Sequence, residues 1–390
     1  MKSNYKKLAP YIRLVDIRNT SDERCDLLGV SVDKHFIKSI ANTIGTDWRT
    51  YKVIQKGQFC YIPDTSRRGD KMGIALLTDY DIALVSQAYT VFEIINQEQL
   101  LPEYLNLWFK RPEFDRYARF HSHGSVREIF DWEEMCNVEL PIPEIEEQRK
   151  IVEAYKTIEK RIALKRKIND NLADQLATLL AKLFYDNNVS FDNLPNNWTV
   201  STLGTYCDVK SGYAFKSDWW QDGGVKIIKI ANIKDFTIDF NDCSYVSAEN
   251  AQKATQFSVV PGDILIAMTG ATTGKFGIVP FIDFVPRVNQ RVGKFFLGSK
   301  PLKKAPFLFA TLLQKDVIKK LQPDGETGSA QDNLSPDDIK NIPIIYPSVE
   351  IIDAFNDHNK AILKQMMVNF AEINSLNDTL TVFLQTLSSF

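Results

Sequence analysis

Residues 139–151 read ELPIPEIEEQRKI, and residues 343–355 read PIIYPSVEIIDAF. In both stretches a short apolar run ends at a proline, and a segment with helical spacing follows it. Pro143 corresponds to Pro347, a separation of 204 residues (347 − 143). That separation is the length of a domain plus a linker, so the match indicates that the chain consists of two related halves.

The match extends upstream of these prolines through most of each half. HGSVREIFDWEEM at 123–135 corresponds to TGSAQDNLSPDDI at 327–339, and KGQFCYIPDTSRRGDKMGIALL at 56–77 corresponds to PGDILIAMTGATTGKFGIVPF at 261–281. A series of matches at nearly one offset indicates a duplication, because chance would produce isolated matches. The matched residues include Gly57 with Gly262, Gly69 with Gly274, Gln87 with Gln290, and Gly124 with Gly328.

A long helix is predicted after each matched proline. Apolar residues recur there at alternating spacings of three and four, and neither run contains Pro or Gly, so each helix is expected to span about 40 residues, or about 60 Å. The two apolar seams predict that the helices pack as an antiparallel coiled coil with pseudo-twofold symmetry; a coiled coil between two copies of the chain is the alternative. The seam comprises Ile151, Ile158, Ile162, Leu172, Leu176, Leu179, Ile362, Met366, Ile373, Leu376, Leu380 and Phe383.

Three asparagines, Asn169, Asn359 and Asn369, also occupy seam positions. A polar seam residue reduces stability but can fix the register of a helix pair. The alternative is that these residues lie where the pair frays or is solvated.

The segments before the two helices have the size of domains and mix short β-like runs with one helix-like stretch each, at 101–120 and 304–322. A short helix starting at Ser335 is predicted from the near capping box formed with Asp338. The predicted fold class is α+β. We expect a first domain at 1–143, a first long helix at 144–189, a second domain at 190–346 and a second long helix at 347–390.

Composition restricts the kind of protein. The net charge of −2 means that contacts with nucleic acid must come from local basic patches. Five isolated cysteines, none in a CxxC pair, are typical of reduced thiols inside the cell, so a cytoplasmic protein is expected. We expect no signal peptide at the N-terminus and no membrane span, because the chain lacks an apolar run of 18 residues.

Catalytic patterns are lacking. MTGATTGKFG at 268–277 resembles a phosphate loop, but only three residues separate Gly270 from Gly274 and Phe276 follows Lys275, so no hydroxyl is placed for Mg²⁺. No GxGxxG motif and no methyltransferase motif are present. His121 and His123 form an HxH pair without the further ligands of a zinc site. An enzyme is therefore not expected, nor a cofactor or metal bound by this chain.

Residue types that read DNA grooves recur in matched loops of the two halves. Arginine reads guanine and Asn or Gln reads adenine through paired hydrogen bonds. The loops keep their glycines and differ in the residues between them, which favours a reading surface over a repeated catalytic loop. The candidate DNA-binding residues are Arg67, Arg68, Lys71, Gln87, His121, His123, Ser125 and Arg127 in the first half, and Thr272, Thr273, Lys275, Asn289, Gln290, Arg291, Gln331 and Asn333 in the second.

The order and repetition of these motifs resemble the specificity subunit of type I restriction–modification systems. The resemblance covers nearly the whole chain. It is carried by LPNNWTVSTLGTYCDVKSGYAF at 194–215, VVPGDILIAMTGATTGKFGIV at 259–279, NQR at 289–291, GSAQDNLSPDDIKNIPIIYPS at 328–348 and ELPIPEIEEQRKIV at 139–152. The first half lacks the LPxxW…LG opening, which fits two domains of different recognition type.

The resemblance implies that each domain reads one half of an asymmetric bipartite site in double-stranded DNA, while the helices fix the spacer. It implies two adenine methyltransferase subunits using S-adenosylmethionine, and two motor-nuclease subunits using ATP and Mg²⁺, as partners. Two other classes remain open from the residues alone: an adaptor that bridges proteins through its helices without reading DNA, and a self-sufficient methyltransferase, which the lack of its motifs disfavours.

Overall fold

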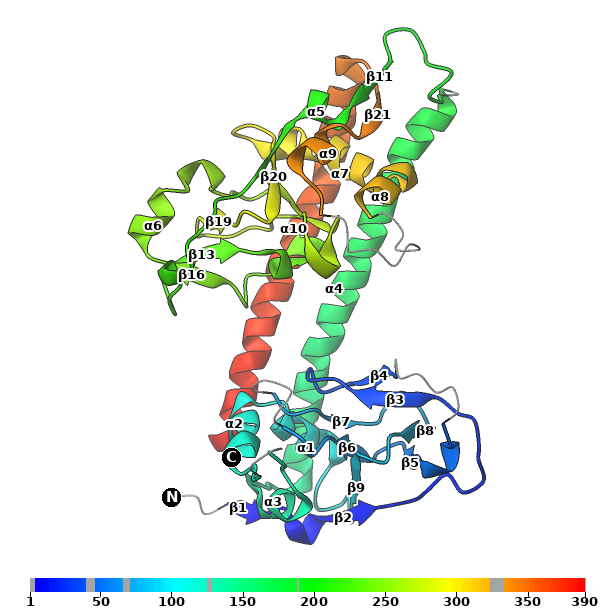
Figure 1. The fold of residues 1–390 in the computed structure, drawn as a ribbon, viewed down its shortest axis with the longest axis vertical. Coiled ribbons are helices and arrows are strands. Elements are labelled where there is room, and N and C mark those ends of the chain that lie inside the picture. The colour runs from blue at the N-terminus through cyan, green and yellow to red at the C-terminus, as the bar shows by residue number, and fades with distance from the viewer. Residues whose placement is uncertain are drawn as a thin grey trace. The chain divides into compact units, whose positions relative to one another are not determined.

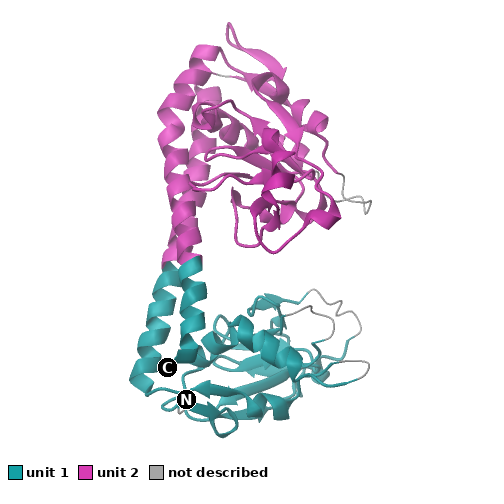
Figure 2. Ribbon diagram, turned by 90° about the vertical axis from the view of Figure 1, so that its left-hand side faces the viewer, with its two compact units in different colours: residues 1–160, 378–390 teal, residues 161–377 magenta. Residues whose placement is uncertain are grey.

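The computed structural model describes residues 4–39, 46–65, 71–124, 128–187, 189–322 and 333–389. The chain divides into two compact units, unit 1 with residues 1–160 and 378–390, and unit 2 with residues 161–377 (Figure 2). Both unit boundaries fall inside a long helix, so each unit contains part of both helices. The long helices are α4 (Ile145–Asp186) and α10 (Val349–Thr386).

Unit 1 is built on two sheets (Figure 1). One has the order β2 (Ile12–Val15), β9 (Thr90–Ile94), β6 (Phe59–Tyr61), β7 (Ile74–Leu76); the other has the order β4 (Phe36–Lys38), β3 (Leu27–Val30), β8 (Ile82–Val85), β5 (Lys52–Gln55). β3 and β8 are parallel and the other neighbours are antiparallel. β1 (Tyr5–Lys7) pairs with β10 (Glu139–Pro141) just before α4.

The first helix-like stretch forms two helices, α1 (Pro102–Phe109) and α2 (Pro112–Phe120), followed by α3 (Trp132–Asn137). The break falls at Arg111, whose extended backbone is what a following proline favours. Phe59, Phe92 and Phe109 form the centre of the core, with ring centroids 5.0 to 6.3 Å apart. Tyr155 of α4 and Leu384 of α10 pack into the same core, so both long helices help to bury the domain.

Unit 2 repeats this plan. Its main sheet has the order β12 (Asp208–Ser211), β20 (Val292–Phe296), β17 (Ile264–Ala267), β18 (Phe276–Ile278), β15 (Phe236–Ile238), β14 (Ile233–Lys234). A second sheet has the order β16 (Ser244–Val246), β13 (Val225–Ile228), β19 (Arg287–Val288), with β13 and β19 parallel. β11 (Thr199–Thr202) pairs with β21 (Pro343–Tyr346) just before α10.

The second helix-like stretch is also two helices, α7 (Ala305–Leu312) and α8 (Lys315–Leu321). α9 (Pro336–Lys340) begins with the expected capping box, in which the side chain of Ser335 accepts from Asp338 N and the side chain of Asp338 accepts from Ser335 N. The remaining helices are α5 (Leu203–Tyr206), α6 (Ala248–Gln252) and the 3-10 turns η1 (Ala9–Tyr11), η2 (Trp48–Thr50), η3 (Ser217–Trp219), η4 (Ile230–Asn232), η5 (Thr255–Phe257), η6 (Gly270–Thr272), η7 (Pro301–Lys303) and η8 (Leu387–Ser389).

The duplication predicted from the sequence is therefore visible in the topology. The order β2-β9-β6-β7 in unit 1 matches β12-β20-β17-β18 in unit 2, and the parallel pair β3–β8 matches β13–β19. In each half two short helices, a third short helix, an edge strand and a long helix then follow in the same sequence order. The fold class is α+β with long helices, as expected.

Within each unit the two long helices contact one another. In unit 2, Arg161 and Lys165 of α4 pair with Glu372 of α10, and Asn169 contacts Met366, so the residue numbers run in opposite directions along these segments. In unit 1, the rings of Tyr155 and Phe383 lie 5.8 Å apart. Of the seam residues, Ile151, Ile162, Leu176, Met366 and Ile373 are buried, while Ile158, Leu172, Leu179, Ile362, Leu376, Leu380 and Phe383 are partly buried.

The buried stripe of each helix is wider than the heptad seam. Neighbouring positions are buried as well, among them Ala173, Leu180, Leu363, Met367 and Phe370. A helix that covers a globular core as well as a partner helix needs this wider apolar face, whereas a free-standing coiled coil needs only the narrow seam. The heptad spacing in the sequence predicted only the narrow seam and not the additional buried positions.

Candidate nucleic-acid interface

The candidate residues Asn289, Gln290 and Arg291 form the turn between β19 and β20 of unit 2. Val292 N donates to Asn289 O, which closes the turn at 2.9 Å, and Asn289 Oδ1 accepts from Arg291 N. Asn289 is partly buried, while Gln290 and Arg291 are exposed. Hydrogen bonds within the turn fix its backbone, and the side chains of Gln290 and Arg291 are exposed to solvent.

The backbone of Met268, in the loop 268–277, hydrogen-bonds to the turn 289–291 and to the residue after Asn333. Its N–H donates to Arg291 O at 3.0 Å, and its carbonyl oxygen accepts from Leu334 N at 2.8 Å. The loop 268–277, the turn 289–291 and exposed Asn333 therefore lie side by side. These segments are far apart in the sequence, and the structure brings them together.

The loop that resembles a phosphate loop is a hairpin connection between β17 and β18, whose register pairs Ile266 with Phe276. Gly274 has φ of +80°, and a Cβ there would lie 2.3 Å from Leu321 O, so this glycine allows a turn and a close approach to α8. Thr273 Oγ1 donates to Gly270 O, and Thr272 is partly buried. Lys275 is exposed, with Nζ 3.2 Å from Asp235 Oδ1, and an exposed ion pair of this kind is weak.

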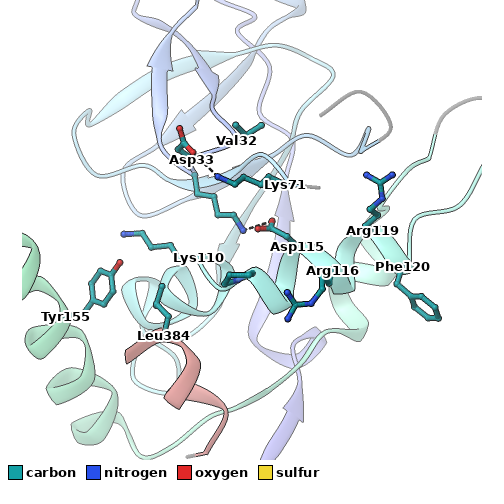
Figure 3. A pocket seen from close by; sticks show the side chains of 12 residues that line it. Val32, Asp33, Lys71, Lys110, Asp115, Arg116, Arg119, Phe120, Tyr155 and Leu384 are labelled. Carbon is teal, nitrogen blue, oxygen red and sulfur yellow. Dashed lines mark hydrogen bonds and ion pairs between the residues drawn. The ribbon is translucent and has the colours of Figure 1, made fainter. Parts of the chain in front are cut away.

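In unit 1, Lys71 lines a hollow of about 980 Å³ together with residues of α2 (Figure 3). Arg116, Arg119 and Phe120 stand along one side of the hollow, and the side chain of Phe120 is 81% exposed. Lys110 and Tyr155 lie on the opposite side. The hollow combines cations with exposed aromatic and apolar surface, a combination found at nucleic-acid interfaces.

A buried ion pair forms the floor of this hollow. Lys34 Nζ lies 2.7 Å from Asp115 Oδ1, and Asp115 also accepts from Met72 N at 2.9 Å. Burial lowers the pKa of Lys34, and the neighbouring Asp115 opposes this shift. Because its charge is matched by Asp115 and its side chain is buried, Lys34 fixes the α2 end of the hollow and is not available to a ligand.

The two histidines of the HxH pair share one carboxylate. His121 Nδ1 lies 3.3 Å from Glu134 Oε2, and His123 Nε2 lies 3.6 Å from Glu134 Oε1. The ring of His121 also lies 4.2 Å from that of Tyr117, tilted by 33°. Within the described residues, no group of three or more His, Cys, Asp or Glu side chains has the arrangement of a metal site.

Of the other candidates of unit 1, the structure describes Gln87, which is exposed in the turn between β8 and β9. Arg67, Arg68, Ser125 and Arg127 of the first half and Gln331 of the second lie outside the described residues, so their placement stays a prediction. Arg116, Arg119 and Phe120 were not among the residues predicted from the sequence. The spacing could have indicated them, because two arginines three residues apart on an amphipathic helix share a face.

These features define the class of protein as a duplicated α+β protein with long helices and, in unit 2, three polar segments brought side by side. The family model described as "Type I restriction modification DNA specificity domain" matches residues 8–173 and 195–381. The chain belongs to this family.

Curated relatives include two specificity subunits from Methanocaldococcus jannaschii. The chain is 26% identical over 281 residues to the type I restriction enzyme MjaVIII specificity subunit, covering 69% of this chain and 65% of the relative. It is 23% identical over 300 residues to the MjaIX specificity subunit, covering 72% and 66%. An alignment with the EcoAI specificity subunit of Escherichia coli is 29% identical but covers only 26% of this chain and 18% of the relative. The chain thus aligns with less than two thirds of the MjaVIII relative.

Solved structures with similar chains include the type I restriction–modification S subunit from M. genitalium, 15% identical with a TM-score of 0.49, covering 98% of this chain and 95% of that one. The HsdS subunit from Thermoanaerobacter tengcongensis is 18% identical with a TM-score of 0.36, covering 98% and 96%. Membership therefore rests on the family match. A search of the described part of the chain for a helix long and apolar enough to cross a membrane found none.

Proposed function

We propose that this protein is the DNA-specificity subunit of a type I restriction–modification system and reads an asymmetric bipartite site, one half with each unit. The observation that carries the proposal is the duplicated domain, whose copies keep one topology while the residues of their matched loops differ. Two such domains supply two different reading surfaces. Side chains that hydrogen-bond to base edges, such as Asn289, Gln290 and Arg291, would specify the sequence, and lysines would position the protein on phosphates.

The long helices would act as the spacer between the half-sites. In this proposal they form an antiparallel coiled coil with pseudo-twofold symmetry, linking recognition domains at 1–143 and 190–346 through helices at 144–189 and 347–390. The interhelical contacts of Asn169, Lys165 and Arg161 within unit 2 support this arrangement. A continuous helix has a fixed rise per residue, so its length would define the unspecified bases of the target.

The partners in this proposal are double-stranded DNA, two adenine methyltransferase subunits and two motor-nuclease subunits. S-adenosylmethionine, ATP and Mg²⁺ would be bound by those partners, and this chain would bind no cofactor and would catalyse no reaction. In this proposal the complex reads double-stranded DNA in the cytoplasm.

The experiment that tests the proposal is a single-molecule methylome of cells that express this chain with a neighbouring methyltransferase subunit, compared with that subunit alone. A new bipartite adenine-methylated motif that depends on this chain is expected. A stable complex without any such motif would contradict the proposal and favour the adaptor, which bridges proteins without reading DNA. Methylation by this chain without a partner would favour the self-sufficient methyltransferase.

Lys275 and the turn 289–291 are expected to respond differently to substitution. Lys275→Ala should weaken binding to all duplexes about equally and reduce the salt slope by about 0.9 for one lost phosphate contact. Asn289→Ala or Gln290→Ala should relax one half-site and cost about 1–3 kcal/mol in discrimination. Binding titrations with a matched and a scrambled duplex at several salt concentrations measure both effects. A Lys275→Ala variant with wild-type affinity and salt slope would show that loop 268–277 is only a structural turn.

Lengthening the helices is expected to change the preferred spacer. Four residues add about 6 Å of helix, close to the length of two base pairs. A four-residue insertion after Asn169, with a matched insertion in the facing part of α10, should therefore shift the methylated motif to a longer spacer. Replacement of four exposed helix residues without any insertion is the control. An active complex that keeps its original spacer would exclude the spacer role of the helices.

A further inference from the structure

Unit 2 carries a cluster of aromatic rings and lysines that the proposed readout does not use. We call it the aromatic–lysine cluster; it comprises Tyr213, Phe215, Trp219, Trp220, Lys216, Lys229 and Lys253. It is formed by the segment after β12, by the residue that follows β13 and by the end of α6. Figure 1 shows β13, β16, β19 and α6 gathered in this part of unit 2.

The rings form one packed group. The rings of Tyr213 and Trp219 are nearly parallel, with an interplanar angle of 13° and centroids 6.3 Å apart, and Phe215 meets both tryptophans at 5.9 and 6.5 Å. Phe215 is buried, and the two tryptophans are only partly buried. One face of the group therefore belongs to the core, and the other remains at the surface.

Each lysine ammonium lies over a tryptophan. Lys229 Nζ is 3.8 Å from the Trp220 ring centroid, and Lys253 and Lys216 Nζ are 4.4 and 5.6 Å from that of Trp219. A cation over a ring face is attracted by the ring quadrupole without being neutralised. The rings thus restrict the positions of three long side chains and leave their positive charge intact.

These lysines differ from Lys275 and Lys294 of unit 2, which have carboxylate partners. Lys275 pairs with Asp235 at 3.2 Å, and Lys294 pairs with Asp263 at 2.7 Å. Among the residues that the structure describes, no ion pair joins a carboxylate to Lys216, Lys229 or Lys253. Asp218 of η3, Asp222 and Glu249 of α6 are near in sequence and exposed, yet none forms such a pair.

The cluster is attached directly to the candidate readout turn. Tyr213 N donates to Val288 O at 2.8 Å, Gln290 N donates to Tyr213 O at 2.9 Å, and Asn289 N donates to Ile228 O, the residue before Lys229. A Cβ on Gly212 would lie 2.3 Å from Val288 O, so only glycine permits this approach. These backbone bonds hold Tyr213 and the residue before Lys229 against the turn 289–291.

We propose that the aromatic–lysine cluster is a phosphate clamp that holds the DNA backbone beside the bases read by the turn 289–291. The inference rests on the proposed function and adds to it the residues that would bind phosphate. Lys253 Nζ donates to the neutral side-chain oxygen of Asn250 at 2.8 Å, so its charge is not neutralised. Ammonium groups without a carboxylate partner attract phosphate oxygens and release counterions. The tryptophans restrict the lysines before DNA arrives, so less side-chain entropy is lost on binding. Backbone contacts of this kind position the protein and carry no sequence information, which leaves specificity to Asn289, Gln290 and Arg291.

The test is a salt titration of DNA binding by the full chain in complex with its methyltransferase subunit, using a duplex with the methylated motif and a scrambled duplex. The variant Lys216→Gln/Lys229→Gln/Lys253→Gln should bind both duplexes more weakly by the same factor. Its log affinity against log salt should be shallower by about 2–3, since each lost phosphate contact removes about 0.9. The matched variant with arginine at the three positions should retain the wild-type slope.

Two further variants keep the test decisive. Lys253→Gln alone changes one exposed side chain and should reduce the slope by about 0.9 even if the triple variant folds poorly. Trp220→Leu keeps all three charges and removes the ring under Lys229, so it should lower affinity for both duplexes with little change in slope.

The outcomes separate the inference from the proposed function. A wild-type complex that does not distinguish the two duplexes would contradict the proposed function itself. A wild-type complex with normal specificity, together with an unchanged slope in the glutamine variants, would overturn only the clamp. Selective loss of binding to the motif duplex would overturn it as well, because it would mean base readout. Loss of methyltransferase association would instead assign the surface to a protein partner.

Discussion

Asp263→Ala is expected to lower the free energy of unfolding of unit 2 by about 3–5 kcal/mol, because it leaves a buried ammonium without its counter-charge. Lys294 Nζ lies 2.7 Å from Asp263 Oδ2 and also donates to Ser258 O at 2.6 Å. The side chain of Lys294 is 10% exposed and that of Asp263 is 2% exposed. Asp263 additionally accepts from Val260 N, so the substitution also removes the partner of a backbone N–H. Hydrogen exchange of the peptides that contain β17 and β20 measures the effect locally.

Asp235→Ala is the matched control, because Asp235 pairs with Lys275 at the surface with its side chain 80% exposed, and such pairs contribute about 0–1 kcal/mol. Burial raises the pKa of Asp263 although Lys294 opposes the shift, so desolvation outweighs the attraction between the two groups. Replacing both partners with apolar residues, Asp263→Leu/Lys294→Met, should therefore cost far less than Asp263→Ala. Equal effects of Asp263→Ala and Asp235→Ala would contradict the buried ion pair.

Asn169→Leu is expected to destabilise the paired helices of unit 2 by about 1–3 kcal/mol, because it leaves the buried amide of Asn369 without its acceptor. Asn369 Nδ2 donates to Asn169 Oδ1 at 2.8 Å, and Asn169 Nδ2 donates to Met366 O at 3.3 Å. Both asparagines are 1% exposed, which favours the interpretation that they fix register over the fraying alternative. Exchange protection of α4 after residue 161 and of α10 before residue 377 measures the loss.

The double variant Asn169→Leu/Asn369→Leu should recover or exceed the wild-type protection, since no buried amide remains unpaired. It should also lose register specification, which the methylome would report as more than one spacer length. Asn187→Leu is the control, because Asn187 is exposed beyond the end of α4. A double variant that stays as unstable as the single variant would contradict the pairing of the two amides.

The sequence predicted the architecture well where the signal was periodic or repeated. The 204-residue offset predicted two copies of one α+β domain, and the strand orders of the two units agree with it. The heptad spacing predicted helices of about 40 residues, and α4 and α10 have 42 and 38. The capping box at Ser335 was also confirmed. Spacing and capping are local properties of the chain, so they can be read from neighbouring residues alone.

The sequence predicted one helix-like stretch in each half but not the break inside it. Each stretch divides into two helices, at Arg111 in unit 1 and at Gln314 in unit 2. In unit 2 no proline follows the break, and the Gln314 side chain donates to Ala310 O and to Ala177 O of α4. This contact with a helix from another part of the chain cannot be read from the local sequence.

The sequence by itself determined that the chain is duplicated, that long helices follow each copy, and which polar loops are candidates for reading DNA. Only the tertiary structure decided that Met268 joins three of those loops, that Lys294 is a buried partner of Asp263, and that Lys229 and Lys253 lie over tryptophans beside the turn 289–291. The physical reason is that the sequence records a lysine in the same way whether its charge is neutralised in a core or exposed at a surface. Its role depends on which distant residues the fold places around it.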